Sequence, residues 1–362
     1  MYLKIDEIRE LHVEVTNKCN AACPMCDRNI FGSNIKAGRG LDEWSIEDIQ
    51  SVFSNELPNL ECVYFCGTHG DPLVAKNLFF AVEAAKTKGA RIEIFTNGSL
   101  RSKKWWLDFL EILDENDRIS FGIDGIETNH LYRRNTNIDI ILRNLDLVCK
   151  SKTQAKWDFL AFKHNEHEVE KCKELAVKYG VDEFRIRRTA RFDTFDPFPV
   201  LDKKGNIEYY LEQPDNQDLR HPDIEKMKKV APVVDIKAAY EYLTNINSFG
   251  FAKSNLNSFG DYEISCLYKK NKRIYVNSRL EVFPCCYISD HYETYKKHTK
   301  EELKYPVNEL TLRKKTWNEI LNHSFFNNGL ESSWTDVNVI PRCIKTCGVA
   351  NREQGQILKQ KI

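Results

Sequence analysis

The first half of the chain alternates between short apolar runs and amphipathic stretches, and this alternation limits the possible folds more than any other feature. Six strand-like runs are expected at 11–16, 62–66, 91–96, 119–123, 157–162 and 183–186. Helical patterns lie between them at 46–53, 75–88, 104–113, 138–150 and 166–179. Alternating β and α elements predict a parallel sheet with helices on its outside.

The number of these units favours a partial barrel. Each takes about 30 residues, and a closed α/β barrel needs eight of them over about 250 residues. The periodicity stops after Arg191, so we expect an α/β fold with a laterally open (βα)6 TIM-like barrel; a doubly wound sheet is the alternative. We place the barrel at 1–192, a connector at 193–262 and a small loop-rich domain at 263–362.

Composition excludes several classes of protein. The 362 residues carry 53 basic and 53 acidic side chains, and this zero balance argues against coating nucleic acid or an anionic membrane. No apolar run approaches the roughly 18 residues that a membrane span needs. The acidic N-terminus lacks an apolar signal core, which predicts a cytoplasmic protein. In a reducing compartment, clusters among the twelve cysteines indicate metal ligands or catalytic groups.

Three cysteines follow the first predicted strand directly. Cys19, Cys23 and Cys26 form a C-x₃-C-x₂-C loop at the carboxyl end of the strand, where α/β barrels carry their active sites. Three thiolates can hold three irons of a cubane cluster, whereas electron-transfer clusters use four cysteines. The missing ligand leaves one metal position open. A zinc knuckle with a distant fourth ligand is the alternative.

The segment from Leu11 to Cys26 resembles the first strand and cluster loop of the radical S-adenosylmethionine (SAM) enzymes. The resemblance implies a 4Fe–4S cluster whose open iron binds SAM. It further implies reductive cleavage of SAM to a 5′-deoxyadenosyl radical, which abstracts a hydrogen from the substrate. Met25 stands where the family usually has an aromatic residue that touches the adenine.

Later strand ends carry further matches to the family. They are a glycine-rich turn at 67–72, the triplet Thr96-Asn97-Gly98, the segment 119–133 and the segment 162–168. Gly122 stands where family members often have a serine, and Asp124 is a possible substitute. The resemblance implies that SAM contacts six residues: Met25, Gly70, Asp71, Asp124, Arg133 and Asn165. An ordinary turn at 70–72, a solvated Arg133 and a helix-capping Asn165 are the alternatives.

The sixth predicted strand carries several arginines. Alternation places Arg185 and Arg187 on one face of the sheet and Arg188 on the other. If the first pair points into the barrel, it could bind an anionic group of the substrate. If the pair points outward, both residues are surface charges.

The C-terminal region holds five cysteines and resembles the auxiliary-cluster modules called SPASM and twitch domains. The resemblance and the cysteine count imply one auxiliary 4Fe–4S cluster held by Cys266, Cys285, Cys343 and Cys347, with Cys286 as the alternate ligand. A four-cysteine zinc site is the alternative. Because the region shows little apolar periodicity, we expect metal ligation, more than a core, to hold it together.

These observations together predict a radical SAM enzyme that modifies a peptide or protein. A radical SAM dehydrogenase or epimerase of a small molecule such as a sugar is the second reading, and a zinc-stapled module that binds RNA or protein without catalysis is the third. The expected partners are SAM, the substrate and an electron donor such as flavodoxin or ferredoxin, with neither a membrane nor nucleic acid.

Overall fold

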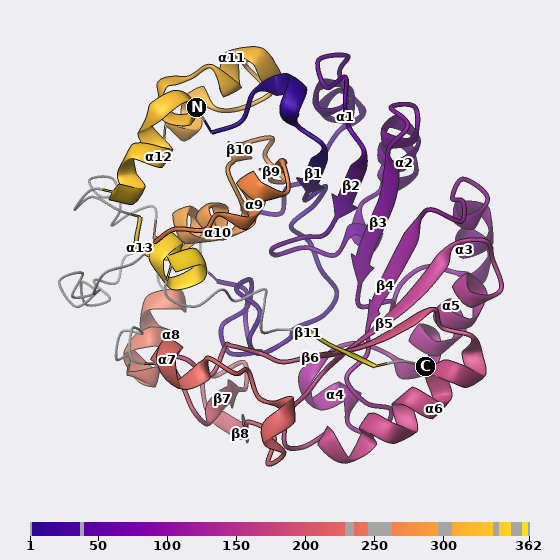
Figure 1. Cartoon of the computed structure of the whole chain (residues 1–362). Helices are drawn as coiled ribbons and strands as arrows, with labels where there is room; N and C mark the ends of the chain where they lie inside the picture. The colour runs from indigo at the N-terminus through magenta and orange to yellow at the C-terminus, as the bar shows by residue number, and fades with distance from the viewer. Residues whose placement is uncertain are drawn as a thin grey trace.

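In the computed structural model, the chain is described at residues 2–36, 40–228, 235–244, 263–295, 306–335, 340–348 and 357–360. The predicted strands form one curved sheet with the helices on its outer side (Figure 1). The strands of this sheet are β1 (Glu10–Val13), β2 (Cys62–Phe65), β3 (Arg91–Thr96), β4 (Arg118–Gly122), β5 (Gln154–Leu160), β6 (Glu183–Arg187), β9 (Arg273–Val276), β10 (Val282–Phe283) and β11 (Ile357–Gln360). The helices beside the first six strands are α1 (Ile46–Val52), α2 (Leu78–Lys86), α3 (Lys103–Leu110), α4 (Asn129–Tyr132), α5 (Ile138–Cys149) and α6 (Val169–Tyr179).

The strand order confirms the partial barrel. β1 to β6 lie side by side in sequence order, and every neighbouring pair among them is parallel. A doubly wound sheet would reverse its strand order at a switch point, and this sheet does not. The fold is therefore an α/β partial barrel, as the alternation in the sequence predicts.

The C-terminal region extends this sheet at both edges, which the sequence did not indicate. β9 pairs with β1 in parallel, β10 returns antiparallel to β9, and β11 pairs antiparallel with β6. The described part of the sheet thus has nine strands instead of six. The other C-terminal helices are α9 (Leu267–Lys270), α10 (Cys286–Tyr295), α11 (Trp317–Leu321), α12 (Leu330–Ser332) and α13 (Pro341–Cys343).

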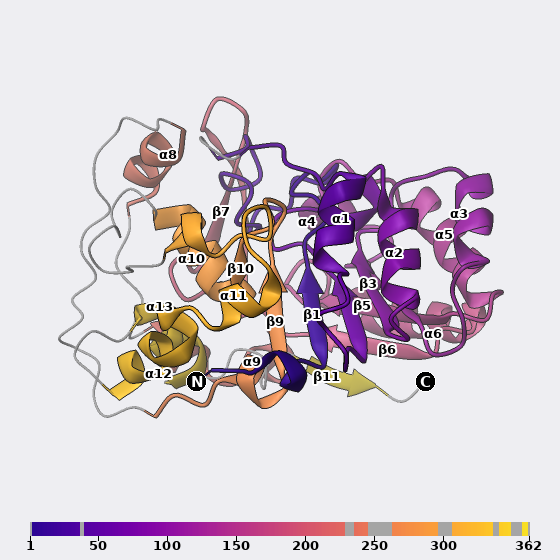
Figure 2. The same cartoon turned by 90° about the horizontal axis from the view of Figure 1, so that it is seen from above.

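The expectation that metal, more than a core, organises the C-terminal region needs correction. Tyr275, Trp317 and Phe326 are buried in the same hydrophobic cluster as Leu11 and Val63 of the barrel. The indole Nε1 of Trp317 also donates a hydrogen bond to the backbone oxygen of Val52, at 2.9 Å. Figures 1 and 2 show these elements on the side where the barrel is open. Apolar burial therefore joins this region to the barrel.

The connector carries structure that its turn-rich sequence did not predict. The strands β7 (Phe198–Leu201) and β8 (Ile207–Leu211) form an antiparallel hairpin, followed by α7 (Ile224–Lys228) and α8 (Ile236–Thr244). Residues 229–234 and 245–262 of the connector lie outside the described residues. No helix in the described ranges has the length and apolar character needed to cross a membrane.

Candidate functional site

The loop after β1 carries the three cysteines predicted to hold a cluster. Arg28 fixes its shape, because one guanidinium nitrogen, Nη2, donates to the backbone oxygens of Cys19 and Ala21, at 2.9 and 2.8 Å. The backbone N–H of Cys26 donates to the oxygen of Cys23 at 3.1 Å. The loop therefore presents its thiols from a rigid turn at the carboxyl edge of the sheet.

The sulfurs of this loop share one electrostatic environment. Burial raises the pKa of the Cys19 thiol, and the charges of Asp71, Cys23 and Cys26 raise it further. Burial also raises the pKa of Cys23, to about 11, while the neighbouring Arg133 guanidinium counteracts part of this effect. Thiols that influence one another this way fit metal ligation, because a bound metal deprotonates them.

Asn97 links the cluster loop to the turns after β2 and β3. Its amide Nδ2 lies 3.7 Å from the Cys19 sulfur, 2.9 Å from Oδ1 of Asn20 and 2.7 Å from Oδ2 of Asp71. The Asp71 carboxylate also accepts from the Thr96 hydroxyl and from the backbone N–H of Asn97. Burial raises the pKa of Asp71, although these donors counteract the effect. Asp71 therefore ties the glycine-rich turn to the end of β3.

The position of Gly70 admits no side chain. A Cβ atom there would lie 1.8 Å from the backbone oxygen of Thr16. The N–H groups of His69 and Gly70 both donate to the buried carboxylate of Glu14, at 2.6 and 3.1 Å. The glycine-rich turn is thus pressed against the end of β1, directly before the cluster loop, and glycine is needed for that approach.

Arg133 and Asp124, each predicted to contact SAM, form an ion pair. Nε of Arg133 lies 2.6 Å from Oδ2 of Asp124, and the other carboxylate oxygen accepts from the backbone N–H of Leu160 at 2.7 Å. Burial raises the pKa of Asp124, and Arg133 counteracts it. A Cβ at Gly122 would lie 2.6 Å from Nη2 of Arg133. The guanidinium therefore fills the space beside Gly122, which explains why a serine is not accommodated in this arrangement.

Asn165 does not cap the helix that follows it. Its side chain makes no capping hydrogen bond. Instead, Nδ2 donates to the backbone oxygens of Asp124 and Leu160, at 3.0 and 2.9 Å, and Oδ1 accepts from the N–H of Phe162 at 2.7 Å. Asn165 therefore joins the ends of β4 and β5 beneath the Arg133–Asp124 pair, and the capping alternative is wrong.

Met25 belongs to a second apolar cluster that covers the cysteine loop. This cluster also contains Phe31 and Tyr132, together with Val200 and Leu211 of the β7–β8 hairpin. The backbone N–H of Leu201 donates to the oxygen of Phe31 at 2.9 Å. The connector hairpin thus forms a wall against the cluster loop and limits the access of water to it.

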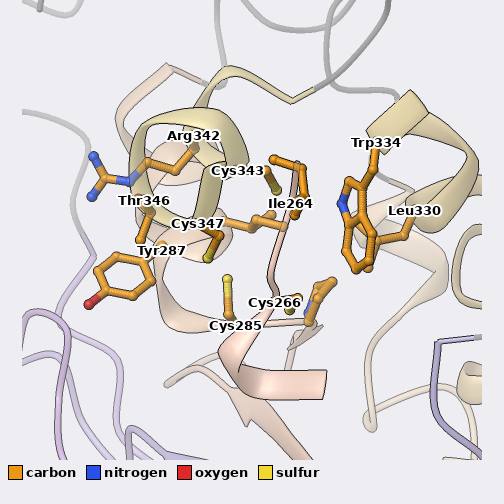
Figure 3. A pocket seen from close by; sticks show the side chains of 12 residues that line it. Ile264, Cys266, Cys285, Tyr287, Leu330, Trp334, Arg342, Cys343, Thr346 and Cys347 are labelled. Carbon is orange, nitrogen blue, oxygen red and sulfur yellow. The ribbon is translucent and has the colours of Figure 1, made fainter. Parts of the chain in front are cut away.

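The four C-terminal cysteines predicted to bind an auxiliary cluster line one pocket. Cys266 precedes α9, Cys285 follows β10, and Cys343 and Cys347 lie in and after α13. Figure 3 shows the four sulfurs directed toward a common centre. Burial raises the pKa of Cys285, and the charges of Cys286, Cys343 and Cys266 add to it. The chain therefore brings together four thiols that span 81 positions of sequence (347 − 266).

Cys286 faces away from this pocket. It begins α10 instead of continuing β10, so the strand alternation assumed from the sequence does not apply to it. Its sulfur lies 3.2 Å from the hydroxyl of Tyr268, and that hydroxyl lies 2.6 Å from Nδ1 of His12 on the inner face of the barrel. The geometry favours Cys285 over Cys286 as the ligand.

Among the residues that the structure describes, no group of three or more histidine, cysteine, aspartate or glutamate side chains is arranged to hold one metal ion. A cubane cluster is larger than one ion: with iron–sulfur bonds of about 2.3 Å, its thiolates lie roughly 6–7 Å apart.

Two positioning residues escaped the list of site residues drawn from the sequence. Asn97 lies in a triplet that the family resemblance does contain, so the signal was present. Glu14 carried no such signal, because a single glutamate in an apolar run does not show that two backbone N–H groups of the turn after β2 converge on it.

In a comparison with known proteins, residues 13–176 match the family model described as the Radical SAM superfamily. A curated relative, 7,8-dihydro-6-hydroxymethylpterin dimethyltransferase of Methanocaldococcus jannaschii, is 31% identical over 146 residues, covering 38% of this chain and 27% of the relative. A Pyrococcus furiosus tungsten-containing aldehyde ferredoxin oxidoreductase cofactor-modifying protein is 26% identical over 121 residues, covering 33% and 32%. The chain thus matches less than a third of the length of each.

Solved structures share the fold over most of the chain. Streptococcus suis SuiB bound to S-adenosylmethionine superposes with a TM-score of 0.53 at 12% identity, covering 90% of this chain and 68% of SuiB. The AdoMet-bound protein anSMEcpe superposes with a TM-score of 0.50 at 16% identity, covering 88% and 79%. At these identities the likeness establishes the fold alone.

Proposed function

We infer that this chain, whose residues 13–176 match the radical SAM superfamily, is a radical SAM enzyme with one auxiliary iron–sulfur cluster that modifies a peptide or protein. The observation that carries the proposal is the convergence of Cys19, Cys23 and Cys26 with the turns of β2 and β3 at one edge of the barrel. A 4Fe–4S cluster with SAM supplies, when bound, a 5′-deoxyadenosyl radical.

The chain's own residues would bind and orient SAM beside this loop. Gly70 lets the glycine-rich turn pack directly against the backbone of Thr16, where a side chain would collide, and so holds this turn beside the cysteine loop. Asp124 anchors the Arg133 guanidinium through the ion pair. The guanidinium can then bind the carboxylate of SAM. Met25 and the β7–β8 wall exclude water from the same side. These roles are part of the proposal.

Two features support a second, auxiliary cluster. Cys266, Cys285, Cys343 and Cys347 line one pocket together with apolar side chains such as Ile288 and Leu330. Tyr2 contributes a hydroxyl 3.5 Å from the Cys266 sulfur, so the N-terminus of the chain also reaches this site. Four-cysteine ligation is the rule for clusters without an open iron.

A peptide substrate fits the partial barrel with its separate connector wall. Among the solved structures of this fold is SuiB bound to its precursor peptide SuiA, which superposes with a TM-score of 0.53 at 13% identity over 89% of this chain and 66% of SuiB. The peptide complex of a protein with this fold supports the choice of a peptide substrate. An electron donor such as flavodoxin or ferredoxin would supply the reducing electron.

Iron and sulfide analysis of two matched variants tests the two-cluster proposal. Anaerobically prepared parent protein should contain about eight irons per chain if both clusters are 4Fe–4S. Cys343→Ala should lose about half of them, whereas Cys286→Ala should retain them, because only Cys343 lines the pocket. Because Tyr275 and Trp317 remain in the shared core, the Cys343 variant should keep most of its C-terminal fold. Equal iron in both variants would refute the auxiliary site.

A further inference from the structure

The inner face of the barrel is lined by charges that pair with one another. Near its amino-terminal end, Glu10 pairs with Arg273 at 2.7 Å, and Lys156 pairs with Glu183 at 2.9 Å. One step nearer the mouth, Arg185 is held by Asp158 through two contacts of 2.6 and 2.9 Å. Arg185 also donates to the Ser120 hydroxyl at 3.1 Å. Of the two directions that the sequence left open, Arg185 therefore takes the inward one, and its charge is already neutralised by Asp158.

Arg187 is the next inward position toward the mouth, and it differs from Arg185. Arg187 lies beside Leu160 of β5 in the strand register. Within the described ranges, its guanidinium has no hydrogen bond or ion pair. Its charge reaches across the barrel to Cys66 at the end of β2, where it counteracts the burial that raises the pKa of this thiol to about 12. Arg187 is thus an inward-facing cation for which the described part of the chain supplies no anion.

At the level of Arg187, the side chains on the inner face of the barrel are partly exposed. Cys66, Phe95, Leu160 and Arg187 are each half-buried, whereas the deeper side chains Ser120, Asp158 and Arg185 are buried. A ligand entering from the carboxyl edge of the sheet would therefore meet the Arg187 guanidinium together with two apolar side chains and a thiol. The same edge carries the cysteine loop and the glycine-rich turn.

We propose that Arg187 binds an oxyanion of the substrate, a carboxylate or a phosphate, and so fixes the substrate above the barrel interior. The planar fork of arginine matches both oxyanions with two parallel hydrogen bonds. On a peptide, the group would be an acidic side chain, a terminal carboxylate or a phosphorylated residue. The assignment deepens the proposed function and rests on it for the substrate's identity, but the anion site is tested without any turnover.

Cys66 provides a reporter on the opposite side of the barrel, within reach of the charge of Arg187. Iodoacetate and iodoacetamide alkylate the same thiolate, but only iodoacetate carries a carboxylate. The ratio of their rates at Cys66, read by peptide mapping of the anaerobically purified full chain, measures anion recognition. Any effect of Arg187 on the pKa of Cys66 acts on both reagents equally and cancels in the ratio. We expect Arg187→Gln to lower the iodoacetate-to-iodoacetamide ratio about threefold or more.

Arg188→Gln is the matched control, because Arg188 directly follows β6 and its guanidinium contacts the backbone oxygen of Asp218 at 3.5 Å. This control should leave the ratio unchanged. Acetate or inorganic phosphate should suppress the preference for iodoacetate, compared with a chloride control of the same ionic strength. The anion that competes more strongly identifies the oxyanion that Arg187 binds. SAM alone should leave the ratio in place.

Four results would overturn the proposal: an unchanged ratio in Arg187→Gln, no competition by either anion, loss of the preference on adding SAM, or a Cys66 that resists both reagents. The third result would assign Arg187 to the cofactor, and the fourth would show that the mouth is closed. Because labelling requires no cleavage of SAM, a protein that showed the preference but released no 5′-deoxyadenosine would contradict the proposed function alone.

Discussion

Replacing Gly70 by alanine should disable SAM chemistry without unfolding the protein. The new Cβ would lie 1.8 Å from the backbone oxygen of Thr16 and 2.8 Å from the Cα of Asn17. Because an ordinary carbon–oxygen contact is about 3.3 Å or longer, the glycine-rich turn and the cluster loop must separate by roughly 1.5 Å. Both colliding groups are backbone, so no side-chain rotation relieves the clash.

The two costs of this displacement differ in size. Overpacking of this kind destabilises a protein by about 1–3 kcal/mol, less than the roughly 5–15 kcal/mol that keeps a typical protein folded. A misplacement of about 1 Å at a reacting site can reduce the rate about 100-fold. We therefore expect dithionite-dependent release of 5′-deoxyadenosine from SAM to fall by about two orders of magnitude, while the variant remains folded.

Gly89→Ala is the control for this experiment. Gly89 has φ +76° but nothing within 4 Å of its Cβ position, so alanine there introduces backbone strain of about 1–2 kcal/mol without a collision. Its 5′-deoxyadenosine release should match the parent. Parent-like release by Gly70→Ala, or an equal loss in Gly89→Ala, would refute the argument that the close approach at Gly70 is what the site requires.

Three further predictions follow from single contacts. Gly122→Ser should displace the Arg133 guanidinium, because Nη2 of Arg133 lies 2.6 Å from the Cβ position of residue 122. SAM binding, measured by equilibrium dialysis, should weaken about tenfold. An unchanged affinity would show that Arg133 does not hold SAM. Burial lowers the pKa of His12 from 6.5 to about 4, so the folded chain binds fewer protons than the unfolded chain in this interval. Stability of the metal-free protein should therefore fall by up to about 3 kcal/mol as the pH drops from 6.5 to 4, and denaturant titrations of His12→Gln should show a flatter profile. Trp317→Ala should cost about 3–5 kcal/mol and lower the unfolding midpoint of the barrel as well as that of the C-terminal region, because one core joins them; a barrel transition that does not move would contradict this.

The alternation of apolar runs was enough to predict the barrel. β3 occupies the predicted range 91–96, and β6 begins at the predicted Glu183, because apolar side chains alternate with charged ones along both strands. The additions to the sheet could not be found this way. The pairing of β9 (Arg273–Val276) with β1 joins residues more than 260 positions apart, which local periodicity does not encode.

The sequence likewise located some residues of the candidate site but not the contacts between them. Cysteine spacing located the loop that contains Cys19, because ligands of one cluster often lie close in sequence. Sequence matches also located Asp124 and Arg133, but not their pairing with each other. The Arg133 guanidinium lies 2.6 Å from where a Cβ atom of residue 122 would be, and this closeness cannot be read from the sequence.

The central claim is that the loop after β1 binds a cluster that cleaves SAM. The most direct test is chromatographic detection of 5′-deoxyadenosine after the anaerobically reconstituted protein is mixed with SAM and dithionite. We predict its release by the parent and by Cys149→Ala, whose thiol lies at the end of α5 away from the site. Cys23→Ala should fold but release none. Release at the parent rate by Cys23→Ala, or none by a parent protein that carries its full iron, would contradict the account.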